Sequence, residues 1–120
     1  MAIKDSGERT VFPNGSMRDM QEGKGDMVSI PWEAVLRLSK HYEEGAKKYA
    51  ERNWEKGISL HCYIDSGVRH YLKWMRGDED EPHDRAFVWN MLGAIWTQEH
   101  LPHLNDLPFA KQEVDNGHYR

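Results

Sequence analysis

Acidic and imidazole side chains gather in one stretch of the chain, Gly77–Asn90, which reads GDEDEPHDRAFVWN. Four consecutive acids lead into Pro82, His83 and Asp84, and an apolar segment follows. Proline suits the first turn of a helix and negative charge is favoured there, so the acids alone would fit an ordinary helix cap. Carboxylates and an imidazole within one turn are also ligands that Mg²⁺ or Mn²⁺ takes. We interpret the stretch as a metal site where a helix begins.

Spacing within this stretch offers two pairs of metal ligands. Asp80 and His83 are three residues apart, and so are Glu81 and Asp84, so either pair could hold one ion. Asn90 follows His83 by seven residues, which places both side chains on one helical face. Because a polar side chain inside an apolar run is costly without a partner, Asn90 is a candidate for ligand contact.

A second source of carboxylates is the adjacent pair Glu43 and Glu44, in a segment with helical periodicity. Their side chains point about 100° apart on a helix, so we expect only one of them to face inward. The other would be an ordinary surface charge that pairs with Lys47 or Lys48. Carboxylates on one helix and at the mouth of another are how helical bundles build metal sites.

Further polar residues are candidates for substrate contact, each with a structural alternative. Arg69 could reach a phosphate or pair with Asp65, and His70 is as much a structural histidine as a functional one. In the loop after the first expected helix, Trp54 could cover a base and Asn53 could read its edge. Packing of Trp54 against the core is the more usual role for such a residue.

Residues 1–30 are polar and show neither helical nor strand periodicity, apart from turn chemistry at Pro13-Asn14-Gly15. A frayed terminus is one interpretation. The alternative is a loop that folds over a ligand, with Arg18 and Lys24 as phosphate contacts. The GKG triplet is not a P-loop, since the GxxxxGK[ST] pattern is missing.

Apolar residues at three- and four-residue steps predict an all-α fold with three main helices, at about 31–50, 59–76 and 82–100. Ser59 is a good N-cap for the second helix and Gly77 a natural stop. Gly45 in the first helix favours close helix packing there, and the third helix is expected to be the most buried. The expected domains are an N-terminal polar arm (1–30), a helical catalytic domain (31–100) and a C-terminal tail (101–120).

The composition is polar for a chain that must bury a core: 120 residues, 38% hydrophobic, mean hydropathy −0.86. We therefore expect the helical bundle to be completed by oligomerisation. A net charge of −4 provides no basic field for a nucleic acid polymer. The single Cys62, the lack of an apolar leader and the lack of a membrane-spanning run predict a cytoplasmic protein with no membrane partner.

Taken together, these pieces resemble the phage and prophage family of dATP/dGTP diphosphohydrolases. The resemblance covers roughly Gly15 to Glu99, and its most specific pieces are NWEKG and the RH pair. Two departures are Ala50, where glycine is expected, and the acid at Asp84, which favours Asp80 with His83 as the metal ligands. The matching segments are Gly15–Asp26, Tyr42–Ile58, Ser66–Gly77 and Asp78–Asn90.

Such proteins are similar to the wider MazG-type all-α pyrophosphohydrolases, helical dimers or tetramers that use acid-bound Mg²⁺. The resemblance implies Mg²⁺-dependent hydrolysis of purine deoxynucleoside triphosphates to monophosphate and pyrophosphate, by a homodimer or homotetramer in the cytoplasm of a bacterial host. The alternative is a module that sequesters a nucleotide without cleaving it. The implied metal ligands are Glu43, Glu44, Asp80, Glu81, His83 and Asp84. The implied catalytic residues are Glu44, Asp80, Glu81 and His83. The implied substrate contacts are Arg18, Lys24, Lys48, Asn53, Trp54, Arg69, His70 and Asn90.

Overall fold

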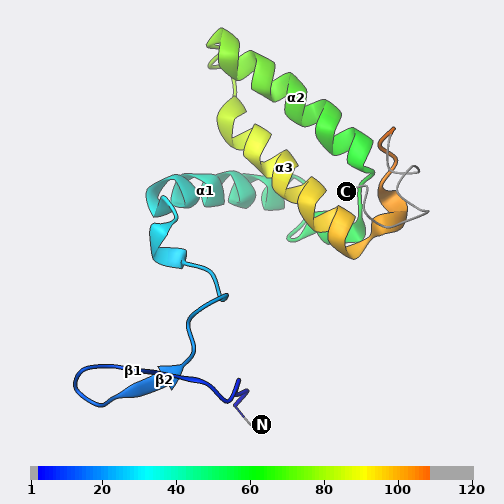
Figure 1. Cartoon of the computed structure of the whole chain (residues 1–120). Helices are drawn as coiled ribbons and strands as arrows, with labels where there is room; N and C mark the ends of the chain where they lie inside the picture. Colours follow the sequence, from blue (N-terminus) through cyan, green and yellow to red (C-terminus); the bar gives the residue numbers. More distant parts are fainter. Residues whose placement is uncertain (1–2, 109–120) are drawn as a thin grey trace. The chain divides into compact units, whose positions relative to one another are not determined.

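Three α-helices dominate the computed structural model of the chain, which describes residues 3–108 (Figure 1). This confirms the all-α class expected from the sequence. Among the described residues, no helix has the length and apolar character needed to cross a membrane. In chain order the elements are β1 (Arg9–Val11), β2 (Met17–Asp19), the 3₁₀ helix η1 (Met27–Ser29), α1 (Trp32–Lys48), the 3₁₀ helix η2 (Asn53–Lys56), α2 (Leu60–Arg76), α3 (His83–His100) and the 3₁₀ helix η3 (Pro102–Leu104).

The chain separates into two compact units, Met1–Trp32 and Glu33–Arg120, and each is described by itself. The first unit contains a hairpin that the sequence does not predict. β1 and β2 pair antiparallel, with Arg9 opposite Asp19, and the chain turns through the Pro13-Asn14-Gly15 segment. Strands of three residues are too short to show an alternating pattern, so only the turn is visible in the sequence. The sequence therefore indicates a polar arm with a turn but does not reveal its two strands.

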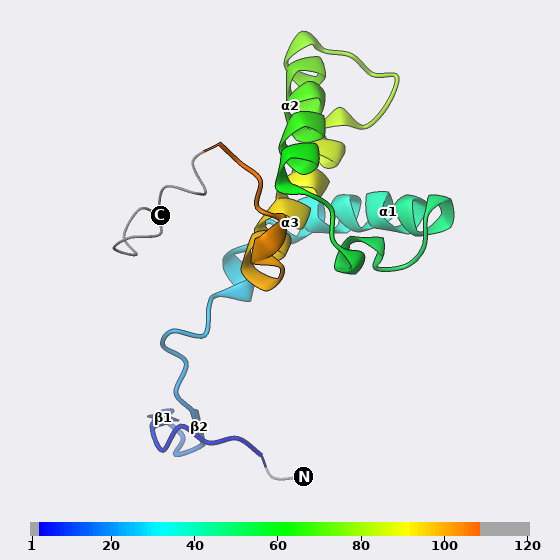
Figure 2. The same ribbon diagram turned by 90° about the vertical axis from the view of Figure 1, so that its right-hand side faces the viewer.

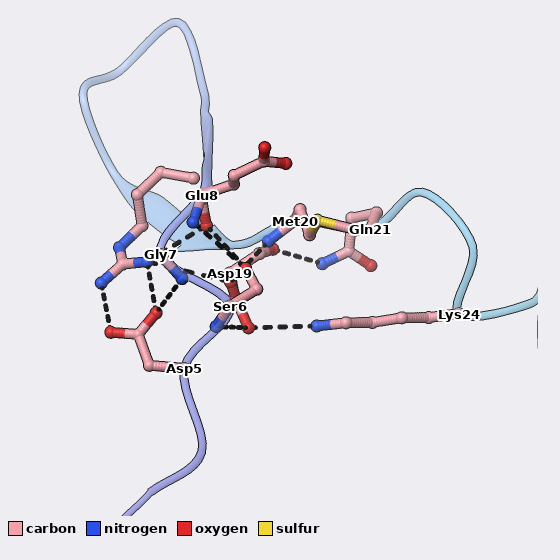
Figure 3. Close-up of polar contacts among 9 residues, drawn as sticks. Asp5, Ser6, Gly7, Glu8, Asp19, Met20, Gln21 and Lys24 are labelled. Carbon is pink, nitrogen blue, oxygen red and sulfur yellow. Dashed lines mark hydrogen bonds and ion pairs between the residues drawn. The ribbon is translucent and has the colours of Figure 1, made fainter.

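Asp19 organises the polar contacts of the hairpin unit (Figure 3). Its carboxylate accepts hydrogen bonds from the backbone N–H groups of Ser6 (3.2 Å) and Met20 (3.0 Å) and from the Ser6 hydroxyl. Lys24 reaches the same carboxylate at 3.3 Å. The hydrogen bonds from Ser6 lower the pKa of the Asp19 carboxyl well below its usual range. The ammonium of Lys24 therefore already has an anionic partner within its own unit.

Helix α1 begins directly after Pro31 and ends two residues earlier than expected, at Lys48. Glu33 in the first turn and lysines in the last turn match the helix dipole. The helix lies at a wide angle to α2 and α3 (Figures 1 and 2), and its side chains His41 and Tyr42 meet Trp89 of α3 edge-to-face, at ring-centroid distances of 6.0 and 6.2 Å.

Helices α2 and α3 form an antiparallel hairpin that closes through residues 77–82 (Figures 1 and 2). As expected, Ser59 caps α2 by accepting the N–H of Cys62 at 3.3 Å, and Gly77 ends it in the left-handed region with φ of 86°. Pro82 lies one position before its expected place, as the N-cap of α3 rather than in its first turn.

The helix hairpin packs closely because two glycines lie between its helices. A Cβ atom on Gly93 of α3 would lie 2.4 Å from a ring carbon of Tyr63, and one on Gly67 of α2 would lie 2.5 Å from Met91. A Cβ atom on Gly45 would meet no other atom within 4 Å in the part of the chain that the structure describes. The expectation of close packing at Gly45 was therefore wrong, and the close contact occurs between α2 and α3.

The core is small, and few large apolar side chains are fully buried in it. Leu60, Tyr63 and Ala94 form its centre, with Leu107 packed against them, so the chain after α3 returns to the core. As expected, α3 has the most buried positions, but these carry small or polar side chains: His83, Ala86, Asn90, Gly93, Ala94 and Thr97. Large apolar residues of the same helix stay exposed: Val88, Leu92 and Ile95.

The segment after α3 fixes the start of α2 through a side-chain cap. Asp106 accepts the backbone N–H of His61 at 2.8 Å, which satisfies one of the unpaired donors of the α2 N-terminus. The division of the sequence into arm, helical domain and tail stays a prediction, and most of that tail, residues 109–120, lies outside the described residues.

Candidate functional site

Three potential metal ligands converge where the α2–α3 hairpin closes. One ligand atom from each of Asp78, Asp80 and His83 lies within 4.8 Å of the other two. They border a cavity of about 520 Å³, here called the mouth cavity, which is lined by Trp74 and residues 77–85. The acids come from the connection after α2, and His83 is the first residue of α3. The short connection forces the acids to lie beside the helix N-terminus, where its dipole favours negative charge.

His83 is the buried centre of this group, with only 2% of its surface exposed. Its Nε2 atom lies 2.7 Å from Asp80 Oδ1, and its Nδ1 atom lies 2.9 Å from Nδ1 of His70 on α2. An ionised Asp80 accepts the Nε2–H of His83, so a neutral His83 must accept at Nδ1 and His70 must donate from its Nδ1. The contacts therefore determine the tautomer of both rings.

Arginines lie beside the acids. Arg76 pairs with Asp78, with Nε at 2.9 Å from Oδ1, and this contact lowers the pKa of the Asp78 carboxyl. The hydrogen bond from His83 likewise lowers the pKa of Asp80. Arg85 borders the mouth cavity and provides a positive charge in the first turn of α3. These acids are consequently carboxylates at neutral pH, the form that binds a cation.

Helix α1 adds His41 to the surroundings of the mouth. Burial lowers the pKa of its imidazole, and the nearby Arg85 lowers it further, whereas Glu81 and Asp84 act in the opposite direction. Burial also lowers the pKa of His70. Imidazoles from α1 and α2 are thus kept neutral next to an anionic mouth.

The donor set of the mouth fits a divalent cation. Asp78 and Asp80 offer carboxylate oxygens, and Glu81 and Asp84 border the same cavity. His83 has the arrangement typical of a ligating histidine, because its second ring nitrogen is held by another side chain, that of His70. Carboxylates suit Mg²⁺ and Mn²⁺, and the imidazole is a better ligand for Mn²⁺ than for Mg²⁺.

Glu43 and Glu44 have different surroundings, as the 100° between them requires. Glu44 is exposed and pairs with Lys47 at 3.6 Å, the alternative that the sequence left open. Glu43 borders a groove between α1, η2 and α3. Within residues 3–108, neither glutamate lines the mouth cavity. The structure thus does not bring the expected α1 carboxylates together with the acids of residues 78–84, and their roles as ligands stay predictions.

The expected substrate contacts are also dispersed. Arg69 is exposed and paired with Asp65, and Lys48 lies over the ring of Tyr49 at 5.1 Å. Asn90 is 4% exposed, and its side-chain amide donates to the carbonyl of Ala86 at 2.8 Å, so its polar group has a partner inside α3.

The other expected substrate contacts lie in two separate regions, the hairpin unit and η2. Arg18 is exposed and, with Lys24, belongs to the separate hairpin unit. Asn53 and Trp54 are half-buried in η2, and the Trp54 ring meets Trp96 edge-to-face at 4.9 Å.

Sequence reasoning included Asp78 in the acidic stretch but not among the metal ligands, and it missed Arg85 and His41 as members of the mouth. Asp78 directly follows the glycine that ends α2, and this proximity to the helix end could have identified it. Arg85 follows His83 by two residues, a spacing that does not normally share a helix face. His41 is separated from the acids by some forty residues, and no local pattern indicates their meeting.

A helix hairpin with carboxylates and a buried histidine at its closed end defines an all-α protein with a candidate metal centre. A family profile described as dATP/dGTP diphosphohydrolase, N-terminal, matches residues 14–107. Since the match spans most of the chain, the protein belongs to this family, in agreement with the resemblance seen in its sequence. No curated protein and no solved structure matches the chain.

Proposed function

We propose that the protein is a Mg²⁺-dependent pyrophosphohydrolase that converts dATP or dGTP to the monophosphate and pyrophosphate, with Mn²⁺ as an alternative metal. The supporting observation is the mouth cluster, in which Asp78, Asp80 and His83 present three ligand atoms within 4.8 Å of one another. The family description supplies the substrate class. An ordinary acidic helix cap would not need a buried histidine tied to a second histidine.

Asp78, Asp80 and His83 would hold the cation, which would offset phosphate charge and acidify a water molecule. Glu79, Glu81 and Asp84 border the mouth cavity and have no ion pair among residues 3–108, and we assign to Glu81 the role of orienting a water and taking its proton. Arg85 would stabilise negative charge on the phosphates. His70 would hold the ring of His83 in place.

The direct test is incubation with each canonical dNTP, with and without Mg²⁺ or Mn²⁺, followed by separation of the products. Monophosphate and pyrophosphate should appear from dATP or dGTP only when metal is present. Asp80→Ala and His83→Ala should each abolish turnover while the helical circular dichroism signal is retained. Glu33→Gln, which removes an exposed acid of α1 away from the mouth lining, is the matched control and should keep full activity. Turnover without metal, or full activity in both alanine variants, would refute this proposal.

A non-catalytic nucleotide-binding module is the second candidate. It would keep contacts to the base and phosphates but would not need the carboxylates at the mouth, since these repel an anion. Binding of dATP or dGTP with no product in any metal would favour it. The anionic mouth favours the hydrolase, because carboxylates beside a triphosphate are useful only with a cation between them.

Assembly into a homodimer or homotetramer belongs to the same proposal. Each long helix leaves large apolar side chains in solvent, among them Leu36 of α1, Leu72 and Met75 of α2 and Ile95 of α3, which are 49–69% exposed. Large exposed apolar patches mark interaction surfaces in soluble proteins, and these side chains are candidates to form one. A second copy would complete the bundle, in line with the polar composition of the chain.

A further inference from the structure

A groove of about 890 Å³ lies between α1, η2 and α3, with a lining separate from that of the mouth cavity. Its aromatic residues are Tyr42, Trp54 and Trp96, and we call it the aromatic groove. The volume lies within the range of pockets that hold small organic ligands. The groove has apolar walls and a few charged groups, which is the composition of a binding site for a flat, polar-edged molecule.

The tryptophans of the groove are held in place by their neighbours. Trp54 meets Trp96 edge-to-face at 4.9 Å and 76°, and His100 stacks on Trp96 at 4.5 Å. Both indoles are half-buried. Rings positioned in this way offer stacking surface at little further entropic cost, and nucleobases stack on such surfaces.

Arg52 carries a backbone strain that places its side chain at the groove. Its φ of 54° is the single positive value among the non-glycine residues that the structure describes. Left-handed backbone is unfavourable for arginine, and such positions cluster at functional sites. The result is a guanidinium 4.6 Å from the ring centre of Trp54, also in contact with Glu55. A flat five-donor group is thus presented beside an aromatic surface.

Carboxylates complete the lining of the groove. Glu43 comes from α1, Glu51 from the loop before η2 and Glu99 from α3. A bare anion would find three like charges here, so the groove is unsuited to a phosphate group. A ligand with both hydrogen-bond donors and acceptors on its edge would satisfy the acids and the arginine together.

We propose that the aromatic groove binds the guanine base of the nucleotide and makes the protein prefer guanine to adenine. Guanine presents O6 and N7, which accept two hydrogen bonds from one arginine, and Arg52 lines the groove. Its N1–H and N2 amino group donate to one carboxylate, for which Glu43, Glu51 and Glu99 are the candidates. Adenine replaces O6 by an amino group, which opposes the arginine donors, and it lacks the N2 amino group.

This inference rests on the proposed function for the position of the phosphates. Ten residues of α3 separate His83 at the mouth from Gly93 at the groove, about 15 Å along the helix at 1.5 Å per residue. The side chains of His41 and Tyr42 lie against Trp89 between these two positions. The substrate would lie extended along this face of α3, with its triphosphate directed to the mouth.

Tryptophan fluorescence with dGMP and dAMP tests the groove without requiring hydrolysis, because neither monophosphate can lose pyrophosphate. We expect dGMP to quench the emission and to bind at least tenfold more tightly than dAMP. Arg52→Lys keeps the charge and the strained backbone but loses the bidentate donor. The ratio of the dAMP to the dGMP dissociation constant should therefore fall toward one. Glutamine at one of positions 43, 51 and 99 should have the same effect. Glu33→Gln, an exposed acid of α1 outside the groove lining, is the control and should keep the preference.

The possible results of these binding experiments test the guanine site independently of the proposed hydrolase activity. Equal binding of dGMP and dAMP, or a preference unchanged in Arg52→Lys and in all three glutamine variants, would overturn the guanine site even if dNTPs are hydrolysed. If the tryptophan emission does not change with dGMP but does change with protein concentration, the groove binds a second copy of the chain, and the guanine site is overturned. Selective dGMP binding that depends on Arg52, without any turnover of dGTP, would support the site and refute the hydrolase.

Discussion

Replacing His70 by leucine should weaken metal binding at the mouth although His70 is not itself a proposed ligand. A cation on Nε2 of His83 displaces the proton that Asp80 accepts in the present structure, so His83 must then carry its proton on Nδ1. Within residues 3–108 its acceptor is the Nδ1 atom of His70 at 2.9 Å, provided that His70 then carries its own proton on Nε2. His70 therefore acts as a positioning residue that selects the ligating tautomer and fixes the ring.

The size of the effect follows from the burial of His83, which is 2% exposed. Leucine at position 70 leaves Nδ1–H of His83 without a partner or water, at a cost of about 1–3 kcal/mol. Removal of such an outer partner typically lowers metal affinity about 10–100-fold. Because a factor of ten equals about 1.4 kcal/mol, both estimates agree on a loss of about 1.4–2.8 kcal/mol in binding.

Titration with Mn²⁺, followed through the paramagnetic signal of the free ion, measures this affinity without an activity assay. His70→Asn is the conservative partner variant, because its amide oxygen can accept the same proton from a similar position. We expect the asparagine variant to bind Mn²⁺ within about threefold of the parent and the leucine variant at least tenfold more weakly. If His70→Leu binds Mn²⁺ as tightly as the parent while Asp80→Ala does not, the positioning role is refuted.

The remaining predictions concern stability and assembly. Gly93→Ala should lower the free energy of unfolding by about 1–3 kcal/mol in urea, because its Cβ atom would lie 2.4 Å from the buried ring of Tyr63. Gly45→Ala should instead raise it by up to about 1 kcal/mol, since its Cβ atom meets open space in a helix; equal effects of the two variants would contradict the packing. Stability should be highest above pH 6.5 and should fall as the pH drops below this value, because burial lowers the pKa of His41 and His70 from 6.5 and the unfolded chain takes up their protons first. Sedimentation equilibrium should give at least twice the 14.1 kDa chain mass, and a monomer at micromolar concentration would contradict the oligomer.

Helix ends were predictable because capping chemistry is local. Ser59 and Gly77 act at the two ends of α2 as the sequence indicates, since each effect depends on the residue and its immediate neighbours. The hairpin of the N-terminal unit was not predictable from periodicity, because strands of three residues provide too few positions. Close packing at Gly45 was wrongly expected because a glycine within a helical pattern indicates only a lower helix propensity. The sequence does not indicate which residues pack against that position.

The mouth was predictable in part for the same reason. Asp80 and His83 are three residues apart at a helix start, so their contact at 2.7 Å follows from local geometry. The contact between His83 and His70 joins two helices, and its register depends on how closely Gly67 and Gly93 let them approach. No sequence pattern encodes that register. Only the fold shows that His70 faces a ring nitrogen.

Helix α3 explains both the misread core and the expected oligomer. The fully buried positions of α3 are small, as at Ala86 and Gly93, or polar, as at His83 and Asn90, while Phe87 packs against Tyr71 of α2. Three other large apolar side chains of the helix stay exposed, those of Val88, Leu92 and Ile95, which departs from the usual relation between hydrophobicity and burial. We expect a second copy to cover these exposed side chains. Because the same helix begins at the candidate metal centre, assembly would then be linked to the proposed activity.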